Sequence, residues 1–234
     1  MNKIVSITDK LERGKSMTKV KICGLKTLED VMIVNKYLPE YVGFVFAASK
    51  RQVSDEQANR IKEQLDKRIQ TVGVFVNESQ EHIVSLYEQG ILDVVQLHGN
   101  EDNQYIKELR KKIEVPIIKA VRVQNAEQVK MELQSDADFL LFDTYKKDSY
   151  GGSGECFELA VLKQILKEKT IIKPFFLAGG LNSENVDEVL AEMTCYGVDV
   201  SSGVETAHKK DEAKVQEFIN QVRQAVGCEI EYKR

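Results

Sequence analysis

Two residues of this chain could exchange protons with a bound molecule from the ends of apolar, strand-like runs. Cys23 ends the run KVKIC, and Asp143 ends the run DFLLFD. A thiolate can act as a general base and a carboxyl group as a general acid. Each residue also has a structural interpretation: a cysteine in an apolar strand is commonly a small buried hydrophobic residue, and an aspartate can cap the following loop. Position alone leaves both interpretations open.

Three further side chains could contact a substrate. Arg51 follows the run YVGFVF and the residues AASK, and Gln96 and His98 lie two residues apart in DVVQLH. Side chains two apart in a strand point to the same face, so Gln96 and His98 are expected to lie together. Taken singly, Arg51 is also explained as a solvated loop charge, and His98 as a hydrogen-bonded histidine at a strand end.

Two glycine-containing segments could bind phosphate. Gly179-Gly180 follows the run PFFLA, and Ser201-Ser202-Gly203 precedes a short helical opening expected at Val204-Glu205. Backbone N–H groups and a helix N-terminus favour an anion in such a place. The structural interpretation is two tight turns that need glycine for their backbone conformation. The two segments follow the seventh and the eighth of the strand-like runs described below. Barrels of alternating strands and helices commonly bind phosphate with the loops after these two strands, so we favour the phosphate site.

The elements that must position these residues alternate along the chain. Short β-rich runs alternate with amphipathic helical stretches, and most of the runs lack a polar face, as expected for a parallel sheet covered on both sides. The predicted strands are 19–23, 41–46, 70–75, 93–98, 116–121, 138–143, 174–179 and 196–201. The helical stretches between them supply the long crossovers that parallel neighbours require. Their predicted N-caps include Thr27, Ser54, Ser79 and Asn182.

This alternation predicts an α/β fold, a single eight-stranded parallel (β/α)8 TIM barrel. Active sites of such barrels lie at the C-terminal ends of the strands, where the candidate residues fall. Lys21 shares a face with Cys23, so it could favour the thiolate or form an ion pair inside the barrel; we favour the ion pair. Residues 17–234 are expected to form the catalytic barrel domain, preceded by a poorly ordered N-terminal extension, 1–16.

The composition excludes several classes of protein. The net charge is −4 and no basic block is present, which argues against a nucleic-acid partner. The longest apolar stretches are too short to cross a membrane. The four cysteines form no CxxC pair and no metal-ligand spacing with His82, His98 or His208. We therefore expect a soluble, cytoplasmic protein with reduced cysteines and without a metal site.

The ordered motifs resemble one family, the phosphoribosylanthranilate isomerases of tryptophan biosynthesis. They occur in family order and cover nearly everything after residue 16. The matching segments are VKICGL (20–25), GFVF with SKRQVS (43–54), VGVFVN (72–77), VQLHG (95–99), LFDTY (141–145), GGSG (151–154), LAGGLNSENV (177–186) and GVDVSSGVE (197–205).

The resemblance implies an Amadori rearrangement of N-(5-phosphoribosyl)anthranilate, a phosphorylated small molecule, without a metal or organic cofactor. No obligate protein partner is evident from the sequence. It implies that Cys23 is the general base, Asp143 the general acid and Arg51 the residue that meets the anthranilate carboxylate. Gln96 and His98 are expected to contact the substrate. The expected phosphate-binding residues are Gly179, Gly180, Ser201, Ser202 and Gly203.

Two departures from the family pattern stand out. Glu155-Cys156 follows GGSG where the family usually has a non-acidic residue, and Ala47-Ala48 replaces residues of the Tyr-Pro type.

Two alternative functions remain. One is a histidine-pathway isomerase, which uses an aspartate where this chain has Cys23, and the other is a non-catalytic paralogue that only binds phosphate ligands.

Overall fold

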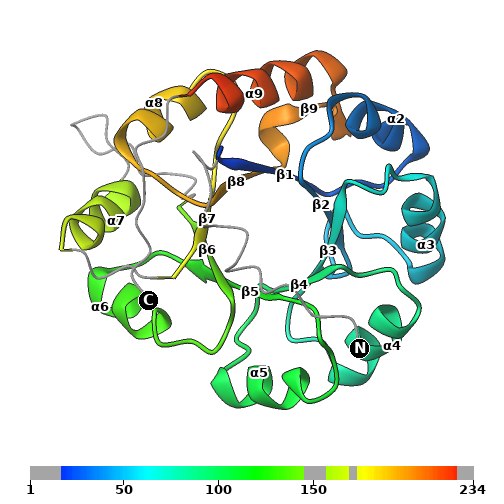
Figure 1. Cartoon of the computed structure of the whole chain (residues 1–234), viewed down its shortest axis with the longest axis horizontal. Helices are drawn as coiled ribbons and strands as arrows, with labels where there is room; N and C mark the ends of the chain where they lie inside the picture. The colour runs from blue at the N-terminus through cyan, green and yellow to red at the C-terminus, as the bar shows by residue number, and fades with distance from the viewer. Residues whose placement is uncertain (1–16, 145–156, 169–172, 226–234) are drawn as a thin grey trace, which may run out of the picture.

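The computed structural model describes residues 17–144, 157–168 and 173–225, and within them the strands form one closed barrel. Its strands are β1 (Lys19–Cys23), β2 (Tyr41–Val45), β3 (Gln70–Phe75), β4 (Val94–Leu97), β5 (Ile117–Arg122), β6 (Phe139–Asp143), β7 (Phe175–Ala178) and β8 (Gly197–Val200). All eight run parallel in sequence order, and β8 pairs with β1 to close the ring (Figure 1). The predicted eight-stranded parallel barrel is confirmed.

An outer ring of helices surrounds the strands (Figure 1). The α-helices of the described residues are α2 (Leu28–Tyr37), α3 (Asp55–Gln64), α4 (Gln80–Glu88), α5 (Asn103–Arg110), α6 (Ala126–Glu132), α7 (Phe157–Lys167), α8 (Val186–Glu192) and α9 (Glu212–Gln224). Between β8 and α9 lie the 3-10 helix η1 (Ser202–Val204) and a hairpin of β9 (Glu205–Thr206) and β10 (Lys209–Lys210). The predicted extension 1–16 and the segment 151–156 lie outside the described residues.

Three of the predicted helix starts are confirmed by side-chain caps. Thr27 and Asp30 form a reciprocal capping box at the start of α2. The side chain of Ser54 accepts a hydrogen bond from the backbone of Gln57, and Ser79 caps α4 in the same way. A cap of this kind stabilises a helix by about 1 kcal/mol, so these residues define where each crossover begins.

The predicted N-cap at Asn182 is wrong, because α8 begins only after Asn185. The Asn182 side chain instead accepts a hydrogen bond from Glu184 N at 2.8 Å, and Asn182 N donates to Asn185 Oδ1 at 2.9 Å. Asn185 Nδ2 in turn donates to the Gly180 carbonyl at 3.1 Å. These asparagines hold the chain in a turn after β7, so the helix starts later.

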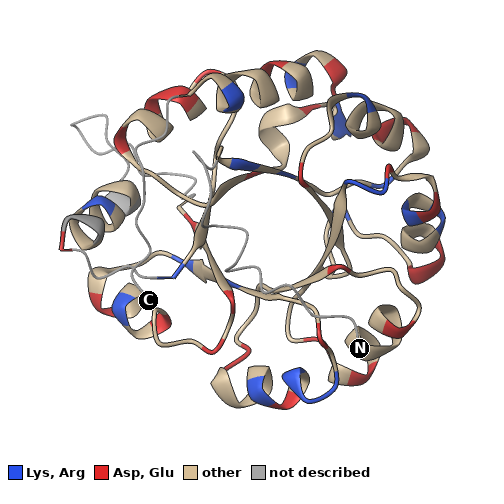
Figure 2. Ribbon diagram, viewed as in Figure 1, with Lys and Arg blue, Asp and Glu red and all other residues tan. Residues whose placement is uncertain are grey.

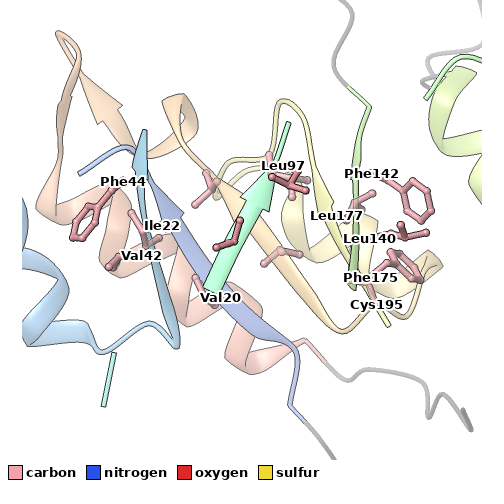
Figure 3. Packing of buried hydrophobic residues seen from close by; sticks show 14 of the residues in the cluster. Val20, Ile22, Val42, Phe44, Leu97, Leu140, Phe142, Phe175, Leu177 and Cys195 are labelled. Atoms are coloured by element: carbon pink, nitrogen blue, oxygen red, sulfur yellow. The ribbon is translucent and has the colours of Figure 1, made fainter. Parts of the chain in front are cut away.

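The strands bury their two faces in different cores. Outward-facing Val20, Ile22, Val42 and Phe44 of β1 and β2 belong to the large core shared with the helices (Figure 3). The inward-facing cluster is Tyr41, Val72, Val94, Ile118, Ala120, Phe139, Leu141, Phe176 and Ala178. These side chains fill the barrel interior, so the polar inward-facing residues at the C-terminal strand ends are left around its mouth.

Charged residues lie mainly on the outer helices and loops, while the strands are mostly uncharged (Figure 2). The exceptions include Lys21 and Lys119, which are buried within the strands. Among the helices of the described residues, none has the length and apolar character needed to span a bilayer.

Candidate active site

Cys23 is the last residue of β1 and lies buried at the C-terminal mouth of the barrel. Its Sγ atom rests against Gly43 of β2, where an added Cβ atom would come within 2.7 Å. The Cys23 carbonyl accepts hydrogen bonds from Ser201 Oγ at 3.0 Å and Lys210 Nζ at 2.6 Å. Burial raises the pKa of the Cys23 thiol, and nearby Lys21 only partly offsets this effect. The thiol is therefore protonated at neutral pH before a substrate arrives.

Lys21 lies two residues before Cys23 on the same inner face of β1. Its side chain is 0% exposed, and its Nζ donates to Asp199 Oδ1 of β8 at 2.9 Å. Burial opposes the charged form, but interactions with Asp199 and with Cys23 together outweigh that cost, so the pKa of Lys21 lies above its ordinary value. The predicted ion pair inside the barrel is confirmed.

Asp143, His98 and Gln96 form a second polar group on the β4–β6 side of the mouth. Gln96 is buried, and its Nε2 lies 3.0 Å from His98 Nδ1. If the amide donates to Nδ1, neutral His98 carries its proton on Nε2. That nitrogen lies 3.6 Å from Asp143 Oδ2. Gln96 Oε1 is buried without a hydrogen-bond partner in the described parts of the chain.

Arg51 reaches the mouth from the loop after β2. The loop folds back on its own strand, because Val53 N donates to the Val45 carbonyl and Gln52 Nε2 donates to the Phe46 carbonyl. The Arg51 guanidinium then forms two hydrogen bonds of 2.8 Å with Glu205, from Nε and from Nη2. One side of the guanidinium is thus occupied by protein, and its Nη1–Nη2 end is the part left for a ligand.

Glu205 and Lys210 are polar residues of the mouth for which the sequence predicted no functional role, although Glu205 ends the segment GVDVSSGVE. Lys210 Nζ lies 2.8 Å from Glu205 Oε1. Burial opposes the Glu205 carboxylate, but hydrogen bonds from Arg51 and Lys210 outweigh it and lower its pKa to about 2. Glu205 is therefore ionised throughout the neutral range.

The two loops that carry the predicted phosphate-binding residues pack against each other, at Gly203 and Leu181. Gly179 and Gly180 have φ angles of 98° and 70°, which residues other than glycine rarely adopt. A Cβ on Gly203 would collide with the Leu181 carbonyl oxygen, so only glycine lets the loops after β7 and β8 pack together. The short helix spans Ser202–Val204 and so begins earlier than expected, because Glu205 pairs with Lys210 in the β9–β10 hairpin. The Ser201 hydroxyl donates to the Cys23 carbonyl at 3.0 Å, which joins the loop after β8 to the end of β1.

The strand ends bring all candidate side chains to one mouth, with β7 and β8 separating Cys23 on β1 from Asp143 on β6. Within the described residues, no group of three or more His, Cys, Asp or Glu side chains could hold a metal ion. Of the two departures from the family pattern, Glu155-Cys156 lies outside the described residues, whereas Ala47 and Ala48 lie in the loop that carries Arg51.

Known proteins resemble this chain over most of its length. Residues 20–221 match the family model described as N-(5'phosphoribosyl)anthranilate (PRA) isomerase. An N-(5'-phosphoribosyl)anthranilate isomerase of Lachnoclostridium phytofermentans is 49% identical over 86% of this chain and 95% of the relative. One of Endomicrobium trichonymphae is 47% identical over 88% of this chain and 99% of the relative.

Solved structures agree with these sequence relatives. The phosphoribosyl anthranilate isomerase of Thermotoga maritima has a TM-score of 0.76 at 36% identity, covering 88% of this chain and 98% of that one. A second crystal structure of such an isomerase, in complex with reduced 1-(o-carboxyphenylamino)-1-deoxyribulose 5-phosphate, has a TM-score of 0.74 at 34% identity. It covers 88% of this chain and 98% of its own.

Proposed function

The chain belongs to the N-(5'-phosphoribosyl)anthranilate isomerase family and is an isomerase of tryptophan biosynthesis, and from this premise we propose that Cys23 and Asp143 are its acid–base pair. The reaction is the Amadori rearrangement of N-(5-phosphoribosyl)anthranilate to 1-(2-carboxyphenylamino)-1-deoxyribulose 5-phosphate. The observation that supports the pair is that β1 and β6 end at the same mouth with both side chains on the inner face.

Asp143 acts first, as the general acid. Its carboxyl group donates a proton to the ribose ring oxygen while the bond between that oxygen and C1 breaks. The anthranilate nitrogen supplies the electron pair, and a protonated Schiff base forms at C1. His98, whose Nε2 lies 3.6 Å from Asp143 Oδ2, is placed to orient this carboxyl group.

Cys23 acts second, as the general base. The Schiff base acidifies the proton on C2, and the Cys23 thiolate removes it to give an enolamine that tautomerises to the ketone. Because burial holds the thiol protonated in the free protein, the thiol must release its proton to solvent after binding, before Cys23 can accept the proton from C2. The positive charge of the Schiff base favours that ionisation, which couples the base step to the preceding acid step.

The remaining residues hold the substrate between acid and base. The free end of the Arg51 guanidinium binds the anthranilate carboxylate with two parallel hydrogen bonds. The backbone of Gly179-Gly180 and Ser201-Ser202-Gly203 binds the phosphate at the opposite end. The buried Gln96 Oε1 accepts a hydrogen bond from a substrate hydroxyl. Anchoring both ends positions the reacting carbons, which is a large part of the rate enhancement in such sites.

The experiment is a fluorescence assay of anthranilate during turnover. The purified chain is expected to consume phosphoribosylanthranilate, and Cys23→Ser is expected to abolish most of the turnover while the variant folds normally. A variant with both Cys23→Ser and Asp143→Asn that isomerised as fast as wild type would refute the acid–base pair. A wild-type chain that bound the phosphorylated ligand without turnover would support a non-catalytic paralogue instead.

A further inference from the structure

A chain of three charged side chains runs from the β9–β10 hairpin to the barrel mouth. It consists of Lys210, Glu205 and Arg51, joined by hydrogen bonds of 2.8 Å. We propose that Glu205 and Lys210 are positioning residues that orient Arg51 toward the carboxylate of the substrate. The proposal rests on the function proposed above for Arg51, and it assigns a role to two residues that do not themselves touch the reacting atoms.

Lys210 is the fixed end of this chain of charges. Its side chain is 1% exposed, and its ammonium group has three acceptors: the Cys23 carbonyl at 2.6 Å, the Ser201 carbonyl at 3.1 Å and Glu205 Oε1. An ammonium group has three hydrogens, so every donor is used. Lys210 therefore ties the end of β1, the start of the phosphate-binding segment and the Glu205 carboxylate to one point.

Glu205 transmits this fixed geometry to Arg51. Its side chain is 6% exposed, and its two oxygens accept hydrogen bonds from Lys210 Nζ, Arg51 Nε and Arg51 Nη2. A planar guanidinium held through Nε and Nη2 cannot rotate about its last bonds. The Arg51 stem also lies across Gly24, where a Cβ would come within 2.5 Å of Cδ. The direction of the free Nη1–Nη2 end is therefore set by Glu205 and by packing on Gly24.

The charges also balance in favour of an anion. Two cations surround one carboxylate, which leaves one surplus positive charge at the mouth. Arg51 is the outermost member, with 29% of its side chain exposed, so the surplus is presented where a ligand can reach it. A carboxylate on the aromatic ring of the substrate fits this position in charge and in planar shape. Glu205 thereby acts on the specificity for a carboxylate-bearing substrate rather than on proton transfer.

The test compares two substrates in Glu205→Gln, which keeps the shape of the side chain and removes its charge. For phosphoribosylanthranilate, kcat/KM is expected to fall about tenfold, mainly through a higher KM. For the corresponding phosphoribosylaniline, which lacks the ring carboxylate, the change is expected to be less than about twofold. Lys210→Met is also expected to lower the ratio of kcat/KM for phosphoribosylanthranilate to kcat/KM for phosphoribosylaniline.

A double-mutant cycle separates positioning from general support of the fold. If Glu205 acts through Arg51, adding Glu205→Gln to Arg51→Ala causes little further loss on the carboxylate substrate. The matched control is Glu101→Gln, which removes a carboxylate with 2% side-chain exposure from its ion pair with Lys119 without touching Arg51. It is expected to lower stability and leave the ratio of the two substrates unchanged.

Calorimetric binding of reduced 1-(2-carboxyphenylamino)-1-deoxyribulose 5-phosphate provides a readout that does not depend on turnover. Glu205→Gln is expected to weaken this binding about tenfold even if the acid–base assignment fails. Equal losses on both substrates, or losses that multiply in the double variant, would overturn the positioning role. Unchanged affinity for the reduced product in Glu205→Gln would overturn it as well.

Discussion

The two sides of the barrel mouth differ in how tightly their polar groups are held. On the β1–β2–β8 side, Cys23, Arg51, Glu205 and Lys210 are connected by hydrogen bonds of 2.6 to 2.8 Å. On the β4–β6 side, His98 and Asp143 lie 3.6 Å apart with 28% and 24% of their side chains exposed. The first side is assembled by these hydrogen bonds before a substrate arrives, whereas the second contains a longer and more exposed contact between a histidine and a carboxyl group.

This difference matches the chemistry proposed for each side. A carboxylate held by two cations, as Glu205 is, has a pKa of about 2 and cannot donate a proton at neutral pH. A general acid needs a different setting, and one contact of Asp143 is with His98 Nε2 at 3.6 Å. Carboxylate recognition has the opposite requirement, because it depends on a fixed direction of the guanidinium. Carboxyl groups therefore serve opposite purposes a few strands apart.

The largest expected effect on activity comes from a substitution on the β4–β6 side of the mouth. Asp143→Asn keeps the size of the side chain but cannot donate a proton, so kcat is expected to fall by about 10²- to 10⁴-fold with a similar KM. Steady-state kinetics on phosphoribosylanthranilate measures both constants. A large rise in KM at unchanged kcat would mean that Asp143 binds substrate, and the contrast between the two sides would disappear.

Breaking the ion pair beneath Cys23 should test the rigidity of the tighter side. Lys21→Met leaves Asp199 buried beside a methyl group, and removal of one partner from a buried pair costs about 3 to 5 kcal/mol of unfolding free energy. Adding Asp199→Asn should recover part of that loss. Urea denaturation measures both variants, and a loss below about 1 kcal/mol for Lys21→Met would show that the pair is dispensable.

The pH dependence should sharpen the role of Cys23. Burial raises the pKa of its thiol, so the deprotonated base becomes more abundant as the pH increases above about 8.5. In wild type, activity also needs protonated Asp143, so loss of that proton offsets the gain of thiolate as the pH rises. In Asp143→Asn, which has no ionisable acid at this position, the residual kcat/KM is therefore expected to rise up to about tenfold per pH unit from neutral into this range. The rise in kcat of the same variant should occur at lower pH, because the bound Schiff base favours the thiolate. A residual kcat/KM of Asp143→Asn that stayed flat from neutral to alkaline pH would contradict the assignment of Cys23 as base.

The smallest expected effect concerns the turn that delivers Lys210. Ala207 and His208 connect β9 to β10 with φ angles of 49° and 62°, the left-handed pair of a two-residue hairpin turn. The double substitution Ala207→Asn with His208→Gly introduces residue types that suit this conformation and should stabilise the chain by about 1 kcal/mol. Thermal unfolding measures the gain, and kcat/KM serves as the control. A loss of stability would show that the two native side chains make contacts worth more than the strain.

Much of this architecture is readable from short stretches of sequence. Strands covered on both faces must be apolar along their length, which is why the runs ending at Cys23 and Asp143 predict buried parallel strands. Thr27, Ser54 and Ser79 cap their helices through residues only three positions away, so local pattern suffices. The predicted N-cap at Asn182 is wrong because the local hydrogen bonds of its side chain form a turn, which competes with the start of a helix.

The sequence by itself determined the barrel, the inward direction of Cys23 and Asp143, and the glycines at the ends of β7 and β8, because all of these follow from alternation and local backbone preference. The tertiary structure alone decided that Arg51 meets Glu205, 154 residues away, and that Lys210 reaches the Cys23 carbonyl across 187 residues. These contacts form only when the barrel closes between β1 and β8. Residues brought together in this way have no fixed spacing in the sequence, so a local sequence pattern cannot predict their contact.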